Sequence, residues 1–155
     1  FKEIELNKLT KEESLAFLEA GFKQINKQIS KERLIQVVKE LDGVIGWLTL
    51  YGWLESKNES NALIKAKEQA LQVLKDEWNS FLAARRAAFK YKQILKLIAF
   101  GINNWKQIKQ VLTKKGIKLS DPQLSLYLNE LESYGWIEYK EDRGWFLTDP
   151  VAAML

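Results

Sequence analysis

The chain has 155 residues and a net charge of +4, and with 46% hydrophobic and 28% charged residues it has the composition of one globular domain or two small ones. It contains no cysteine and no histidine, which excludes disulfides, thiolate or imidazole metal sites and every mechanism built on a Ser-His or Cys-His pair. No apolar run approaches the roughly 18 residues of a membrane span and no signal peptide opens the chain, so a cytoplasmic protein without a membrane partner is expected.

The N-terminal residues do not start with an initiator methionine. Residues 1–6 alternate apolar and polar side chains like the end of a strand, yet no partner strand is apparent nearby. We interpret this as an internal start, with further sequence of a longer protein expected upstream of Phe1.

The first predicted helix begins at a capping box, because Thr10 is followed three residues later by Glu13. Apolar residues then recur at helical spacing, and Gly21 is expected to end the helix. A second helix is predicted from Ser30, which can cap it, to the stop at Asp42-Gly43.

Residues 44–54 form an almost continuous apolar run. Hydrophobicity all round predicts a helix that is buried on several sides, with Gly46 and Gly52 allowing close approach of neighbours. We interpret its aromatic residues as core rather than as a platform for stacking bases: Trp47, Tyr51 and Trp53. One long helix is predicted to follow over residues 58–82.

The second half of the chain has a different order of elements. Three helices are expected to end at Gly101, Gly116 and Gly135, the second of them capped by Asn103 or Asn104. The third helix should be capped by Asp121 and take Pro122 as its first residue. Two strand-like runs follow, 136–139 and 145–147, joined by a five-residue hairpin loop, and a last short helix starts at Asp149-Pro150.

Three helices followed by a β-hairpin is the order of a winged helix, a helix-turn-helix variant in which the hairpin is the wing. No strand pattern occurs between Thr10 and Leu82. The sequence therefore predicts a mainly α protein, with a helical bundle over residues 1–85 and a winged-helix domain over residues 86–155.

Several ordered motifs resemble the C-terminal part of the archaeal P-loop ATPases, relatives of the signal-transduction (STAND) and AAA-type ATPases. Their order and spacing cover nearly the whole chain. The motifs are residues 6–22, Leu41-Asp42-Gly43-Val44-Ile45-Gly46-Trp47-Leu48, Tyr51-Gly52, Tyr91-Lys92-Gln93-Ile94-Leu95 and Asp149-Pro150-Val151.

The resemblance implies that a nucleotide-binding domain comes first, then a helical lid over residues 1–85, then the winged helix. Gly43 to Ile45 stand where the family usually has Gly-x-Pro, whose proline packs near the adenine. Ile45 keeps an apolar surface there without the fixed φ of proline. Arginines in related lids reach the γ-phosphate, which makes Arg33 a third candidate for nucleotide contact, although an exposed surface arginine is the favoured interpretation.

No Walker A motif, Gly-x-x-x-x-Gly-Lys-Ser/Thr, occurs in the sequence. The chain by itself is therefore expected to be non-catalytic and to hold no cofactor or metal, whereas ATP and Mg²⁺ are expected in the parent protein. Its first expected partner is the upstream nucleotide-binding domain of the same chain.

The excess positive charge lies in residues 86–155, which carry 11 Lys/Arg and 7 Asp/Glu. The candidates for DNA contact on the second helix and the turn after it are Lys106, Lys109, Lys114, Lys115 and Lys118. They could form a basic flank together with Arg85, Arg86, Lys90 and Lys92, although a solvated charged face is the favoured interpretation. On the third, recognition helix Gln123 and Asn129 could read adenine, but Glu130 and Glu132 on the same face oppose phosphates. A winged helix that packs against protein is therefore favoured over one that reads DNA.

Three functional hypotheses remain. The leading one is the non-catalytic lid and winged helix of a P-loop ATPase, which couples nucleotide state to the movement of a partner or domain. The alternative is a DNA-binding transcription regulator whose helical half dimerises. The third is an assembly scaffold, for which a protein partner or an oligomer is expected.

Overall fold

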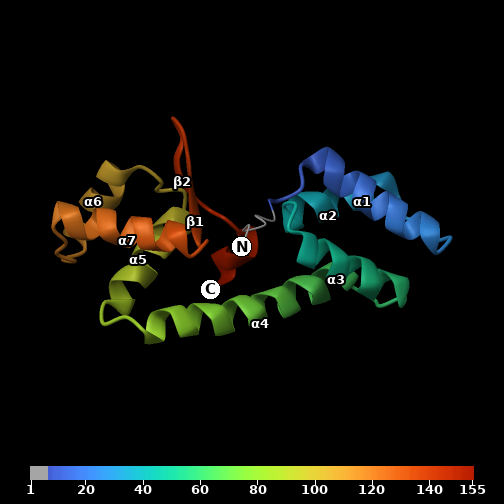
Figure 1. Cartoon of the computed structure of the whole chain (residues 1–155), viewed down its shortest axis with the longest axis horizontal. Helices are drawn as coiled ribbons and strands as arrows, with labels where there is room; N and C mark the ends of the chain where they lie inside the picture. The colour runs from blue at the N-terminus through green and yellow to red at the C-terminus, as the bar shows by residue number, and fades with distance from the viewer. Residues whose placement is uncertain (1–6) are drawn as a thin grey trace, which may run out of the picture. The chain divides into compact units, whose positions relative to one another are not determined.

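A computed structural model describes residues 7–155, and this range is mainly α-helical, as predicted (Figure 1). The strand-like run predicted at residues 1–6 lies outside the described residues. The helices are α1 (Lys11–Gln24), α2 (Lys31–Leu41), α3 (Ile45–Ser56), α4 (Ala62–Ala83), α5 (Ala88–Ala99), α6 (Trp105–Lys114) and α7 (Asp121–Ser133). They are followed by strands β1 (Ile137–Lys140) and β2 (Gly144–Leu147) and by the short 3-10 helix η1 (Pro150–Met154).

The chain divides into two compact units inside α4. We call them the helical unit, which ends at Gln72, and the winged-helix unit, which begins at Val73. The winged-helix unit thus includes the second half of α4. The boundary predicted at residues 85/86 between the helical lid and the winged-helix domain stays a prediction, because compact packing units need not coincide with these domains.

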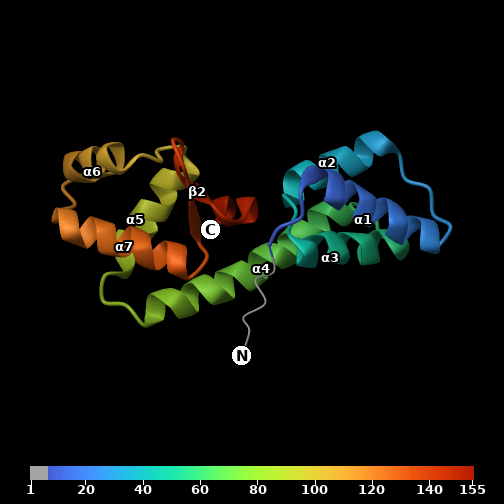
Figure 2. The ribbon, with the colours of Figure 1, turned by 45° about the horizontal axis from the view of Figure 1, so that its top comes forward.

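The helical unit consists of α1, α2 and α3 packed on one another, with the first turns of α4 (Figure 2). The capping box is confirmed: the Glu13 amide donates to Thr10 Oγ1 over 3.1 Å, and the Thr10 amide donates to Glu13 Oε2 over 2.8 Å. The helix stop predicted at Gly21 is wrong, because α1 continues to Gln24. A single glycine in a helix costs only about 1 kcal/mol, and the buried Phe22 holds the last turn against the core.

Helix α3 is not buried on several sides, contrary to the prediction. One stripe faces inward, at Leu48, Tyr51 and Leu54, whereas Trp53 remains 57% exposed. Nothing lies within 4 Å of a Cβ placed at Gly46 or Gly52, so these glycines do not serve close approach. The core of the unit comprises Leu18, Phe22, Leu34, Val37, Val38, Leu41, Leu48, Tyr51, Leu54, Ala62 and Ala66.

The winged-helix unit has the predicted order of three helices and a hairpin, and the pairing of β1 with β2 runs antiparallel from Ile137↔Leu147 to Lys140↔Gly144. The predicted cap of α7 is wrong by one residue: Ser120 is the N-cap, and its hydroxyl accepts from the Gln123 amide. The predicted hairpin loop is shorter than expected, since only residues 141–143 separate the strands.

Aromatic packing ties the second half of α4 to the hairpin. Trp78 lies edge-on to Trp136, with ring centroids 4.8 Å apart, and stacks on Phe81 at 5.2 Å. The remaining core of this unit is formed by aliphatic residues of α5, α6, α7, β1 and η1. These include Ile94, Leu95, Ile98, Ile108, Leu112, Leu124, Leu128, Leu131, Ile137 and Val151.

Candidate functional site

Gly43 has a structural role that the sequence did not reveal. It lies just after α2 with a positive φ of 72°, and its carbonyl accepts a 2.9 Å hydrogen bond from the Leu9 amide. A Cβ at this position would lie 2.0 Å from the Leu9 carbonyl oxygen, so only glycine fits. Ile45, the half-buried first residue of α3, offers side-chain surface in the segment predicted near the adenine, whereas Gly43 has no side chain.

Arg33 has a protein partner. Its Nη2 atom lies 2.9 Å from Oε2 of Glu55, whose side chain is only 8% exposed, and Lys27 Nζ lies 3.7 Å from the other carboxylate oxygen. The pairing accounts for a cation in the first turn of α2, where it opposes the helix dipole. No hydrogen bond or ion pair within residues 7–155 joins Arg33 to Gly43 or Ile45.

Tyr51 lies fully buried beside this charge cluster. Burial, and then the negative charge of Glu55, raises the pKa of the Tyr51 phenol to about 12. Tyr51 therefore stays neutral at physiological pH and acts as a core residue, as predicted. Sequence reasoning missed Glu55, although one acid at the end of an otherwise apolar helix was the available signal.

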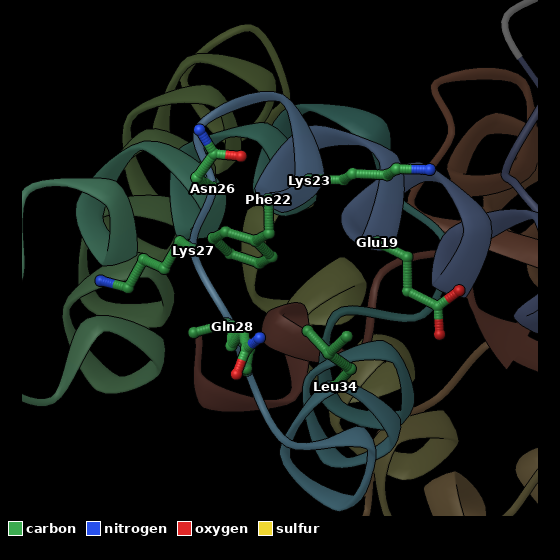
Figure 3. A pocket seen from close by; sticks show the side chains of 8 residues that line it. Glu19, Phe22, Lys23, Asn26, Lys27, Gln28 and Leu34 are labelled. Atoms are coloured by element: carbon green, nitrogen blue, oxygen red, sulfur yellow. The ribbon is translucent and has the colours of Figure 1, made fainter.

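A pocket of about 530 Å³ lies in the helical unit between the end of α1, the loop after it and α2. Figure 3 shows that the polar ends of Lys23, Asn26 and Lys27 point apart rather than toward one centre. Lys27 is also held by Asn58, whose Oδ1 accepts from its Nζ over 2.8 Å. The pocket therefore lacks the convergent polar groups of a ligand site.

The recognition helix α7 differs from its predicted surface at one position. Glu130 does not lie free on the exposed face, because its Oε2 accepts from Arg85 Nε over 3.1 Å and from the Tyr91 hydroxyl. The Tyr91 hydrogen bond, and then that from Arg85, holds the pKa of Glu130 below its ordinary value. Gln123, Asn129 and Glu132 are exposed, as predicted.

Arg85 is packed rather than available to DNA. Its guanidinium carbon lies 3.6 Å from the centroid of Phe81 and 4.7 Å from that of Tyr134, and Nη1 donates to the Phe81 carbonyl over 2.6 Å. Because both Arg85 and Glu130 are engaged, the expected basic flank loses one cation and the recognition helix loses one opposing acid.

The lysines of α6 and of the segment after it separate into two groups. Lys109 is engaged, since Nζ lies 3.2 Å from Asp121 Oδ1 and also donates to the Leu119 carbonyl. The others are exposed and make no ion pair with any residue from 7 to 155: Lys106, Lys114, Lys115 and Lys118. These four, together with Arg86, Lys90 and Lys92 of the expected flank, remain as candidates for phosphate contact.

Residues 7–155 hold no group of three or more Asp or Glu side chains that could hold a metal ion. None of the helices in the same range combines the length and apolarity needed to cross a bilayer.

Comparison with known proteins supports this fold. The family model described as the MCM protein C-terminal winged helix-turn-helix domain matches residues 85–147. A search of curated proteins found no match. Among solved structures, a Walker-type ATPase of Pyrococcus abyssi is similar with a TM-score of 0.83 and 31% sequence identity, over 95% of this chain and 41% of that one.

The chain thus spans less than half the length of the ATPase that it resembles. The sequence-based resemblance to an archaeal P-loop ATPase and the winged-helix prediction are both confirmed by these matches. The chain is a mainly α-helical protein with a winged-helix domain, similar over nearly its whole length to part of an archaeal Walker-type ATPase.

Proposed function

We propose that the chain is the non-catalytic C-terminal lid and winged-helix part of a P-loop ATPase of the AAA or STAND kind, coupling nucleotide state to the movement of a partner or domain. The observation that carries the proposal is the match of 95% of this chain to 41% of a Walker-type ATPase. Because the 155 residues contain no Walker A motif, the phosphates and Mg²⁺ would be held by a nucleotide-binding domain upstream of Phe1.

In this proposal the helical unit closes over the bound nucleotide. Ile45 supplies apolar surface beside the adenine, and Gly43 contributes only through the backbone turn that starts α3. Arg33 would approach the phosphates by exchanging Glu55 for a phosphate oxygen. The exchange does not strip Glu55 of its counterion, since Lys27 lies 3.7 Å from the same carboxylate.

The proposal predicts that the isolated 155-residue chain binds ATP no tighter than millimolar. An exposed ion pair contributes about 0–1 kcal/mol, whereas millimolar binding already requires about −4 kcal/mol. In the protein that includes the nucleotide-binding domain, Ile45→Asp should weaken ATP binding about threefold to tenfold, as loss of roughly 1 kcal/mol of apolar contact implies. Calorimetry on both proteins measures these effects.

Ile64→Asp is the matched control, because Ile64 is an exposed isoleucine of the same unit and should leave ATP affinity unchanged. Two results contradict the proposal. One is a natural reading frame without a Walker A motif upstream of Phe1. The other is low-micromolar ATP binding by the isolated chain, which would require a phosphate site within these 155 residues.

Duplex DNA binding is the second candidate function. The observation in its favour is that Glu130 is sequestered by Arg85 and Tyr91, which leaves Gln123 and Asn129 with one opposing acid fewer than the sequence suggested. The four exposed lysines at and after α6 would contact phosphates. In this candidate the helical unit serves dimerisation, and the family description matched by residues 85–147 is a winged helix-turn-helix.

The affinity for DNA would fall steeply as the salt concentration rises. Each phosphate contact makes the negative slope of log K against log salt steeper by about 0.9. Lys114→Glu/Lys115→Glu removes two of these contacts and should make that slope shallower by about two. Fluorescence anisotropy with a duplex at two salt concentrations measures it, and Lys75→Glu/Lys96→Glu is the charge-matched control, because both lysines are exposed and neither is a candidate for DNA contact. An absence of binding at low salt removes this candidate.

A further inference from the structure

A second cavity, of about 770 Å³, lies wholly within the winged-helix unit. The second half of α4, helix α5 and η1 form its walls, and none of the candidate DNA contacts of α6 or α7 lines it. We call it the α4–α5 groove and define it by Lys75, Trp78, Lys92, Lys96, Phe100 and Ala152.

The charged side chains on the rim of the α4–α5 groove are all positive, and the one negative group that lines the groove in this 155-residue chain is the terminal carboxylate of Leu155. Lys75, Lys92 and Lys96 are exposed, and no Asp or Glu occurs among the described residues that line the groove. None of the three lysines forms an ion pair with a residue between 7 and 155. Lys92 and Lys96 also stand four residues apart on one helix, where like charges repel. An anionic ligand would relieve this repulsion.

The floor of the groove is apolar. Leu95 and Ala152 are buried, and Trp78 is only 6% exposed because it packs on Phe81 and Trp136. Phe100, which follows α5, is 75% exposed and adds a large unpaired apolar surface at the edge. A ligand that fits both features carries apolar groups on one side and carboxylates along its flanks.

We propose that the α4–α5 groove binds an acidic amphipathic segment of a partner protein, most simply a helix with apolar residues at i, i+3 and i+4 flanked by Asp or Glu. Single-stranded nucleic acid fits less well, because it needs exposed aromatic faces for successive bases. Phe100 offers such a face, whereas the Trp78 ring is covered on the protein side. This proposal is independent of any nucleotide role for the helical unit.

The test uses a fluorescent peptide of about 16 residues with Leu at helical spacing and Glu between, since shorter isolated helices are marginal in water. A scrambled peptide of the same composition controls for charge alone. We expect the peptide to bind the chain about fivefold tighter than its scrambled form does. It should bind the Lys92→Glu/Lys96→Glu variant about tenfold more weakly than the unchanged chain, because two surface ion pairs are replaced by repulsive pairs.

Lys114→Glu/Lys115→Glu is the matched control, because it changes the net charge equally at exposed lysines outside the groove. The affinity of this variant for the peptide should stay within about twofold of that of the unchanged chain. Phe100→Ser removes apolar surface without changing charge and should weaken binding severalfold. Three results would each overturn the proposal. They are equal weakening of peptide binding by the two double lysine substitutions, equal affinity for the scrambled peptide, and displacement of the bound peptide by oligothymidine at a lower concentration than by unlabelled peptide.

Discussion

Gly144→Ala is expected to destabilise the winged-helix unit by about 2–5 kcal/mol. Gly144 has a φ of 94°, and a Cβ there would lie 2.1 Å from the Asn103 carbonyl oxygen. The left-handed backbone costs roughly 1–2 kcal/mol for a residue with a side chain, and relieving the overlap adds about 1–3 kcal/mol. Moving the backbone to relieve the overlap also lengthens the 2.7 Å hydrogen bond from the Trp145 amide to the same Asn103 oxygen.

Gly101→Ala separates these two causes. Its φ of 84° is comparable, yet nothing lies within 4 Å of a Cβ at Gly101, so it should lose only the backbone cost of about 1–2 kcal/mol. Urea unfolding, followed at amide signals of β1 and β2, gives both free energies of unfolding. Equal losses of stability in the two variants would show that the close approach of Gly144 to the Asn103 carbonyl adds no cost beyond that of the left-handed backbone.

Arg85→Ala is expected to destabilise the winged-helix unit by about 2–4 kcal/mol. The change removes cation–π contacts with Phe81 and Tyr134, worth roughly 0.5–2 kcal/mol, and leaves the Glu130 carboxylate without its cation. Breaking a buried pair costs about 3–5 kcal/mol, but Glu130 is 34% exposed and water replaces part of the lost interaction. Thermal and urea unfolding measure the loss.

The neighbouring Arg86 is an exposed arginine, so Arg86→Ala is the control and should change stability by no more than about 0.5 kcal/mol. Arg85→Lys should rescue only part of the loss, because an ammonium does not reproduce the planar contact with the rings. A loss equal to that of Arg86→Ala would show that the Arg85 contacts carry no stability.

Acid should act on the same network. The Tyr91 and Arg85 hydrogen bonds lower the pKa of Glu130 below 4.5 in the folded protein. The contribution of Glu130 to the free energy of unfolding is therefore complete above about pH 4.5 and is lost as the pH falls through the pKa of the folded protein. In Glu130→Gln this part of the acid dependence should be absent. The free energy of unfolding must be compared between the unchanged protein and Glu130→Gln at each pH. The Lys67 hydrogen bond also lowers the pKa of Glu40, so Glu40 likewise loses stabilising effect in acid.

Local signals explain why the order of elements could be predicted. The Thr10–Glu13 capping box, the Ser30 cap and the glycines at positions 101, 116 and 135 act through hydrogen bonds and φ angles within a few residues of themselves. Such interactions are present in the sequence itself. The same locality explains the one-residue error at Ser120, since Ser and Asp are equally good caps and stand side by side.

The candidate site was less accessible to sequence reasoning, because its residues act through distant partners. Arg33 pairs with Glu55, 22 positions away, and Arg85 pairs with Glu130, 45 positions away. No periodicity or cap signals such pairs. Sequence reasoning therefore counted Arg85 in a basic flank and Glu130 on the exposed face of the recognition helix, whereas in the fold they form an ion pair.

The sequence by itself determined the mainly α composition, the winged-helix order, the lack of a Walker A motif and the resemblance to an archaeal ATPase, because each depends on local patterns or on spacing along the chain. Tertiary structure decided which charges remain free. It packed Trp78 into the core, left Phe100 exposed and brought Lys75 to the same groove as Lys92 and Lys96. Burial and charge pairing depend on which faces of the helices meet, and packing in three dimensions alone sets those contacts.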